Sequence, residues 1–153
     1  GQEWARVHVK LPFRSDLARS GAIVEYGTRG DAPRYFSVFK GSPESMRHLI
    51  INKPTWYESE YLKLEKQGYR VLTLARRRIL KDEARDLIES AAQGFDTEEE
   101  SGAEVIRDRA ERGLQFAGFA CFQEGMHKDT ASSLRELRDA NLNIHMVTGD
   151  GAF

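Results

Sequence analysis

Two short segments place a cation beside flexible backbone, an arrangement that suits an anionic ligand. In Phe39–Glu44, Lys40 and Gly41 stand where an expected strand turns directly into an expected helix. The ammonium group there would lie near the free amides of a helix N-terminus. In Gln67–Leu72, Arg70 stands near the start of another expected strand and offers a planar fork of donors to phosphate or ribose. Plain structural interpretations stay open for Lys40 as a solvated strand end, Gly41 as a turn former and Arg70 as a surface residue.

A third group with chemical potential closes the last expected strand. Thr148, Gly149 and Asp150 supply a hydroxyl, a close backbone and a carboxylate. The carboxyl ends of strands are where α/β sheets hold ligands and magnesium. A tight turn after a buried strand is the structural alternative.

Common catalytic signatures are absent from the sequence. The chain has neither a G-x-x-x-x-G-K-[ST] phosphate loop nor a G-x-G-x-x-G turn, and its 4 histidines have no H-E-x-x-H spacing. Cys121 is the 1 cysteine, so an intrachain disulfide is excluded, and its apolar strand predicts a small buried side chain rather than a nucleophile.

The composition limits the class of protein. The chain has 153 residues, 40% of them hydrophobic and 31% charged, which fits one domain or one domain with part of another. With 23 Lys and Arg against 24 Asp and Glu, the net charge is −1, so we expect no nucleic-acid partner. No apolar run approaches the roughly 20 residues that span a bilayer.

Hydrophobic periodicity predicts the elements that would hold these residues. Alternation predicts five strands, at Ala5–Leu11, Ala22–Tyr26, Tyr35–Phe39, Tyr69–Ile79 and Leu114–Phe122. The second and third of these would form a hairpin around residues 27–33. One helix is predicted from Ser42-Pro43 to Leu49, and a second from a capping box at Thr55–Glu58 to a stop at Gly68. A third helix, with a capping residue at its start, is predicted over Asp129–Asn141. Residues 81–112 are expected to form two surface helices around a mobile loop. A final strand at Leu142–Val147 would complete a right-handed crossover with a parallel pair.

The motifs taken together resemble a known family. The order of Lys40–Glu44, Gly68–Ala75 and Met146–Asp150 is similar to the nucleotide-binding domain of a P-type ATPase, running into the phosphorylation domain. Leu11–Arg19, Gln67–Ala75 and Gln123–Asp150 most resemble the type V subfamily, particularly its B branch. Type V pumps typically have Ser and Met where this chain has Arg14 and Ser20, and Asn where it has Gly151.

The resemblance implies roles for particular residues. Phe13 would stack on adenine, Lys40 with Gly41 would lie at the inner end of the nucleotide pocket, and Arg70 would reach the phosphates or ribose. Leu72 would pack nearby, and Arg19 belongs to the same nucleotide-binding set. Thr148, Gly149 and Asp150 would belong to the phosphorylation domain, close to the γ-phosphate and magnesium. The Asp-Lys-Thr-Gly-Thr segment that accepts phosphate in such pumps does not occur in this chain.

The predicted architecture is α+β, a twisted antiparallel sheet flanked by helices with a short α/β tail. Residues 1–122 would be the nucleotide-binding domain, with a charged, poorly ordered insertion at about 91–105, and residues 123–153 the hinge and the start of the phosphorylation domain.

The resemblance also implies a parent protein. That protein would be an ATP-driven, Mg²⁺-dependent cation or polycation pump of endolysosomal or other endomembranes, with this domain facing the cytosol. The piece alone would be a monomer that binds adenine nucleotide, contacts the other domains of the pump and is catalytically inactive. The alternative is a non-catalytic interaction domain with the same fold that has lost nucleotide affinity. A haloacid-dehalogenase-like phosphatase is disfavoured because the chain lacks its Asp-x-Asp strand.

Overall fold

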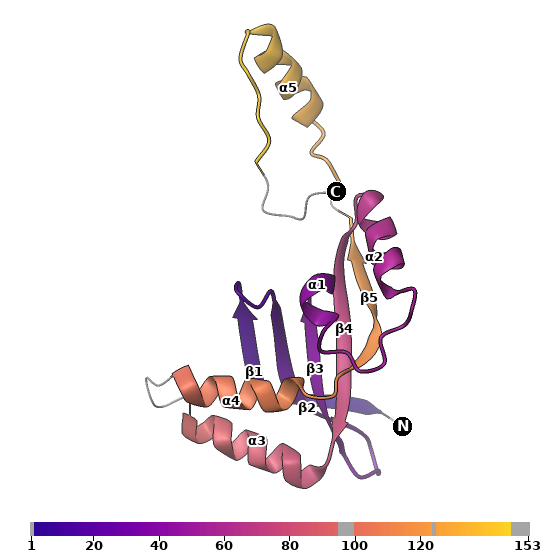
Figure 1. The fold of residues 1–153 in the computed structure, drawn as a ribbon, viewed down its shortest axis with the longest axis vertical. Coiled ribbons are helices and arrows are strands. Elements are labelled where there is room, and N and C mark those ends of the chain that lie inside the picture. Colours follow the sequence, from indigo (N-terminus) through magenta and orange to yellow (C-terminus); the bar gives the residue numbers. More distant parts are fainter. Residues whose placement is uncertain (1, 95–99, 124, 148–153) are drawn as a thin grey trace.

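A computed structural model describes residues 2–94, 100–123 and 125–147 (Figure 1). Five strands form one antiparallel sheet in the order in which they occur along the chain. They are β1 (Glu3–Arg14), β2 (Arg19–Thr28), β3 (Arg34–Gly41), β4 (Arg70–Ile79) and β5 (Gln115–Phe122). The predicted hairpin of β2 and β3 is confirmed, and the strands extend beyond the apolar residues that predicted them.

The first four helices connect and cover these strands, and a fifth follows the last strand. They are α1 (Pro43–Met46), α2 (Tyr57–Lys66), α3 (Lys81–Gly94), α4 (Glu100–Glu111) and α5 (Thr130–Asp139). Ser42 caps α1 by accepting a hydrogen bond from the Ser45 amide at 3.2 Å, as predicted, but the helix ends at Met46 rather than at Leu49. Gly68 has φ +84°, in accord with the predicted stop after α2.

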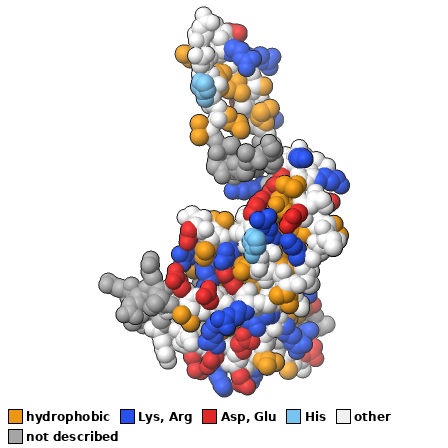
Figure 2. All heavy atoms as spheres, in the orientation of Figure 1, with side chains coloured by type: hydrophobic (Ala, Val, Ile, Leu, Met, Phe, Trp, Pro, Cys, Tyr) orange, Lys and Arg blue, Asp and Glu red, His pale blue; other side chains and the backbone are white. Residues whose placement is uncertain are grey.

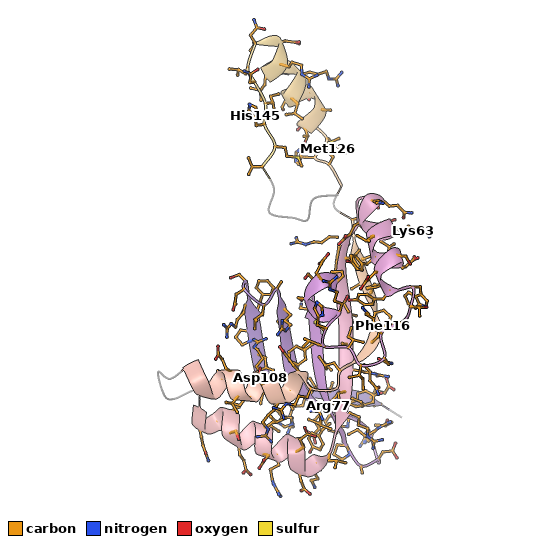
Figure 3. All side chains as sticks on the ribbon, viewed as in Figure 1. Lys63, Arg77, Asp108, Phe116, Met126 and His145 are labelled. Carbon is orange, nitrogen blue, oxygen red and sulfur yellow. The ribbon has the colours of Figure 1, made fainter. Side chains whose placement is uncertain are left out.

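The predicted capping box at the start of α2 is wrong. Trp56 occupies the N-cap position, and its side chain makes no capping hydrogen bond. The aromatic residues of this region pack instead against the sheet. Phe116 of β5 meets Tyr57 of α2 edge to face, with ring centroids 5.4 Å apart (Figure 3). Packing of the first turn onto the sheet therefore takes the place of a polar cap at the start of this helix.

The prediction of two surface helices within residues 81–112 is confirmed by α3 and α4. Both contribute buried residues to the core, namely Ala84, Leu87, Ala91, Ile106 and Ala110. They lie as a helical pair against one face of the sheet (Figure 1). Their outward side chains are charged, and acidic and basic groups alternate over this part of the surface (Figure 2). A narrow apolar stripe rich in alanine is enough to hold these surface helices against the sheet, although their overall composition is polar.

The last helix stands apart from the sheet. In Figure 1, α5 lies beyond the end of β5, and none of its residues is buried. Asp129 precedes this helix without a side-chain capping bond, contrary to the predicted cap. Residues 142–147 form no strand, so the predicted parallel crossover does not occur among the described residues. A strand needs a neighbour for its backbone groups, and within the described part of the chain this segment has no strand beside it.

Within the described residues, no helix combines the length and apolar character required to cross a bilayer.

Candidate functional site

A pocket of about 660 Å³ opens at the end of the sheet where β1, β3 and β5 finish and β2 and β4 begin. Its volume lies in the range of pockets that hold small organic ligands. The lining residues are Phe13, Ala18, Ser20, Lys40, Gly41, Arg70, Leu72, Cys121, Phe122 and Gln123. The structure thus brings together five of the six residues that the resemblance assigned to nucleotide binding: Phe13, Lys40, Gly41, Arg70 and Leu72.

Strand register explains how residues so distant in sequence meet. Lys40 pairs with Ser20 on one side and with Leu74 on the other, and Arg70 pairs with Phe122. Since side chains alternate along a strand, Arg70 and Leu72 share one face of β4. The intervening residues point to the opposite face, where the core lies.

Phe13 reaches the pocket from the end of β1. Its side chain is 64% exposed, and the pairing of β1 with β2 becomes irregular between Leu11 and Arg14. An exposed ring at the rim of a pocket offers one free aromatic face to a ligand.

Gly41 allows backbone segments to approach at the floor of the pocket. A Cβ atom on Gly41 would lie 2.8 Å from the carbonyl oxygen of Ala18. That same oxygen accepts hydrogen bonds from the Ser42 amide at 3.0 Å and from the Ser45 hydroxyl at 3.4 Å. Ala18 itself has φ +48°, the left-handed region that non-glycine residues rarely occupy. The junction of β3 with α1 is therefore locked to the start of β2.

Arg19 does not line the pocket. Its guanidinium donates two hydrogen bonds to the carboxylate of Glu111 on α4, from Nε at 2.8 Å and from Nη2 at 2.7 Å. Its Nη1 donates to the carbonyl oxygen of Leu17 at 3.2 Å. In this structure Arg19 ties the β1–β2 turn to α4 and presents no group to the pocket.

Arg14, one of the departures from the type V pattern, also points elsewhere. Its guanidinium binds Asp16 at 2.8 Å and Glu104 at 3.0 Å, and it is not among the lining residues. The Arg14 hydrogen bond lowers the pKa of Asp16 below its usual range. Ser20, the other departure, does line the pocket.

Sequence reasoning missed the wall that β5 contributes. Phe122 is 52% exposed and lies opposite Arg70, and Cys121 and Gln123 flank it. Cys121 is exposed, so its predicted burial is wrong. Phe122, an aromatic residue at the end of a strand, was the available signal. Its position opposite Arg70 becomes apparent only when the register of β4 with β5 is known.

The pocket is suited to an anion rather than to a metal ion. Lys40 and Arg70 supply positive charge, and no Asp or Glu is among the lining residues within the described part of the chain. In the described part of the chain, no group of three or more His, Cys, Asp or Glu side chains could hold a metal. Thr148, Gly149 and Asp150 lie outside the described residues.

No family model matches the chain. It is 33% identical over 140 residues to the probable manganese-transporting ATPase PDR2 of Arabidopsis thaliana, covering 92% of this chain and 10% of that protein. It is 33% identical over 141 residues to the vacuolar cation-transporting ATPase YPK9 of Saccharomyces cerevisiae, covering 90% of this chain and 8% of that protein. The polyamine-transporting ATPase 13A3 of Homo sapiens is 28% identical over 143 residues, covering 92% of this chain and 10% of that protein.

This chain belongs to the P-type ATPases. Its relatives are consistent with the type V subfamily, whereas the B branch stays a prediction. The P-type ATPase chain spans about a tenth of the length of the curated relatives it matches.

Proposed function

We propose that this chain is the part of a P-type ATPase that binds ATP. The supporting observation is that Phe13, Lys40, Arg70 and Leu72, which come from three separate segments, line a single pocket. An aromatic face, an ammonium group and a guanidinium fork match the three parts of an adenine nucleotide without a Walker loop.

Each residue takes a role that follows from its chemistry. Phe13 stacks on one face of adenine, while Leu72 and Phe122 provide apolar surface on the side of β4 and β5. Lys40 and Arg70 attract the phosphates, since two neighbouring positive charges lower the free energy of a bound polyanion. Arg19 stays outside this contact set and ties the turn that follows Phe13 to α4.

The remaining steps belong to groups outside this chain. The γ-phosphate would pass to an aspartate of the parent protein, because this sequence has no Asp-Lys-Thr-Gly-Thr segment. Mg²⁺ would neutralise charge during that transfer. The described lining residues offer no oxygen ligand set for the ion, so it has no role in our account of this pocket.

The parent protein that we propose is an ATP-driven pump for a cation or polycation in an endomembrane. The relatives named for manganese, cation and polyamine transport support this assignment. The ATP-binding part would face the cytosol, where ATP is available, act as a monomer and contact the other domains of the pump.

Titration of the protein with ATP tests the proposal, with isothermal calorimetry reporting the dissociation constant. We expect saturable binding by the wild type and a loss of at least about tenfold in Lys40→Glu, because the substitution reverses a charge beside the phosphates. Lys63→Glu is the matched control, since Lys63 lies on α2 (Figure 3) and does not line the pocket.

Cys121 gives an independent measurement, because an exposed thiol in the pocket wall reacts with a maleimide. Bound ATP should slow this labelling in the wild type but not in Lys40→Glu. Equal affinity of the wild type and Lys40→Glu, or no binding by either, contradicts the proposal and favours the non-catalytic interaction domain.

A further inference from the structure

Helix α4 contacts the segment that carries Phe13 at the residue before it and at the residue after it in sequence. Arg107 Nη2 donates a hydrogen bond to the carbonyl oxygen of Pro12, the residue before Phe13. Arg14, the residue after it, binds Glu104 at 3.0 Å. The backbone around Phe13 is therefore anchored to a helix by contacts that span 90 and 95 residues of sequence.

The inner part of this connection is a group of three charges, of which two are buried. Glu111 is 6% exposed and Arg107 is 5% exposed. The Glu111 carboxylate accepts two hydrogen bonds from Arg19, at 2.8 and 2.7 Å, and lies 3.6 Å from Arg107 Nη1. Two guanidinium groups thus share one carboxylate and hold the carbonyl oxygens of Pro12 and Leu17.

Burial of these charges is a costly way to stabilise a fold. Removing ions from water costs free energy that their mutual attraction often fails to recover, so apolar residues of similar volume would serve stability as well or better. The charged group fixes the direction of two backbone carbonyl groups, because a planar guanidinium donates hydrogen bonds only in defined directions.

Phe13 needs such an anchor because its own ring is not held by packing. With 64% of the residue exposed, its orientation depends on the backbone at the irregular end of β1. We propose that Arg107 and Glu111 are positioning residues that hold the ring of Phe13 over the pocket and so set the preference for the adenine base. This inference rests on the proposed function.

The test compares ATP with tripolyphosphate, which carries the phosphates but has no base to stack. Arg107→Met keeps most of the side-chain volume and removes the hydrogen bond to Pro12. We expect this variant to weaken ATP binding about 5- to 20-fold, a part of what stacking on an aromatic ring contributes. Its affinity for tripolyphosphate should stay within about twofold, and Arg107→Lys should recover part of the lost ATP affinity.

Hydrogen exchange measures the anchor without any nucleotide. Amides of residues 13–19 should exchange faster in Arg107→Met than in the wild type, while those of β4 should not change. Equal weakening of ATP and tripolyphosphate, or unchanged exchange at residues 13–19, overturns the inference. A wild type that binds no ATP overturns the proposed function, and with it the adenine role, even where the exchange result shows a restrained turn.

The exposed ion pair of Arg14 and Glu104 provides a second test in case Arg107→Met does not fold. Arg14 and Glu104 lie at the surface, so Arg14→Glu and Glu104→Arg should both leave the protein folded. Each single reversal should speed exchange at residues 13–19, and the double reversal should restore the slower rate. Failure of the double variant to restore it counts against anchoring by α4.

Discussion

Gly41 lies directly opposite Arg19 in the pairing of β2 with β3. The two backbones are so close that a Cβ atom on Gly41 would lie 2.6 Å from the Cβ atom of Arg19. Any side chain at position 41 would therefore separate the start of β2 from the end of β3. Because β2 begins and β3 ends at the pocket, the shape of the pocket depends on this contact.

Replacing Gly41 with alanine should lower the free energy of unfolding by about 1–3 kcal/mol, as is usual when atoms are forced into a packed region. Urea denaturation followed by circular dichroism measures the change. Gly125→Ala is the control, because a Cβ atom there meets no other group within 4 Å. Equal stability of Gly41→Ala and the wild type would show that the strands can separate without cost.

Alanine at Phe13 or at Phe122 should weaken ATP binding without destabilising the protein. Base stacking on an aromatic ring contributes about 1–3 kcal/mol, so we expect the dissociation constant to rise about 5- to 100-fold. Both side chains are largely exposed, so the midpoint of urea unfolding should hardly move. Leu80→Ala removes an exposed apolar side chain outside the pocket and should leave affinity unchanged.

Removal of Mg²⁺ should change the affinity for ATP by less than about threefold, since charge attraction in this pocket comes from side chains. The lining residues that the structure describes include Lys40 and Arg70 and no carboxylate. Calorimetric titrations in MgCl₂ and in EDTA, at matched ionic strength, provide the comparison. Strong dependence on Mg²⁺ would mean that the protein supplies ligands for the ion.

The Tyr57 hydroxyl links α2, α1 and β4 within the core. It donates to the carbonyl oxygen of Pro43 at 2.9 Å and lies 2.6 Å from the Thr73 hydroxyl. Tyr57→Phe should lower the free energy of unfolding by about 1–3 kcal/mol, because buried polar groups lose their partner. In a double-mutant cycle with Thr73→Val, the two losses should not add. Additive losses would mean that the two hydroxyls act independently.

Alkaline pH should destabilise the protein through the same residue. Burial raises the pKa of Tyr57 to about 12, whereas an exposed tyrosine in the unfolded chain titrates near pH ~10. The folded state therefore holds the proton more tightly, and this contribution is complete below pH ~10 and lost as pH rises toward 12. Urea midpoints between pH 9 and 12 should fall less steeply in Tyr57→Phe. Parallel curves for both proteins would contradict this assignment.

Part of the candidate site could be anticipated from the motifs that resemble a P-type ATPase. Phe13, Lys40 and Arg70 lie in those motifs, so the resemblance, and not the alternation along the strands, predicts that they meet in one pocket. The role of Arg19 could not be anticipated. Its partner Glu111 lies 92 residues away, and nothing near either residue indicates the pair.

Other differences arise from tertiary packing. Alternation alone does not indicate where along β5 the side chains cease to be buried. The apolar sequence therefore predicts a buried Cys121, whereas this residue is exposed in the pocket wall. Residues 142–147 have the composition of a strand, but the described part of the chain offers them no neighbour.

The sequential order of the strands has a consequence for how the polypeptide acquires its structure. Each strand after the first pairs with the one synthesised immediately before it, so no strand must wait for a distant segment. Topologies dominated by nearby pairings reach the native state faster than those that need long loops to close. We expect the nascent sheet to grow strand by strand on the ribosome, with the pocket completed when β5 arrives.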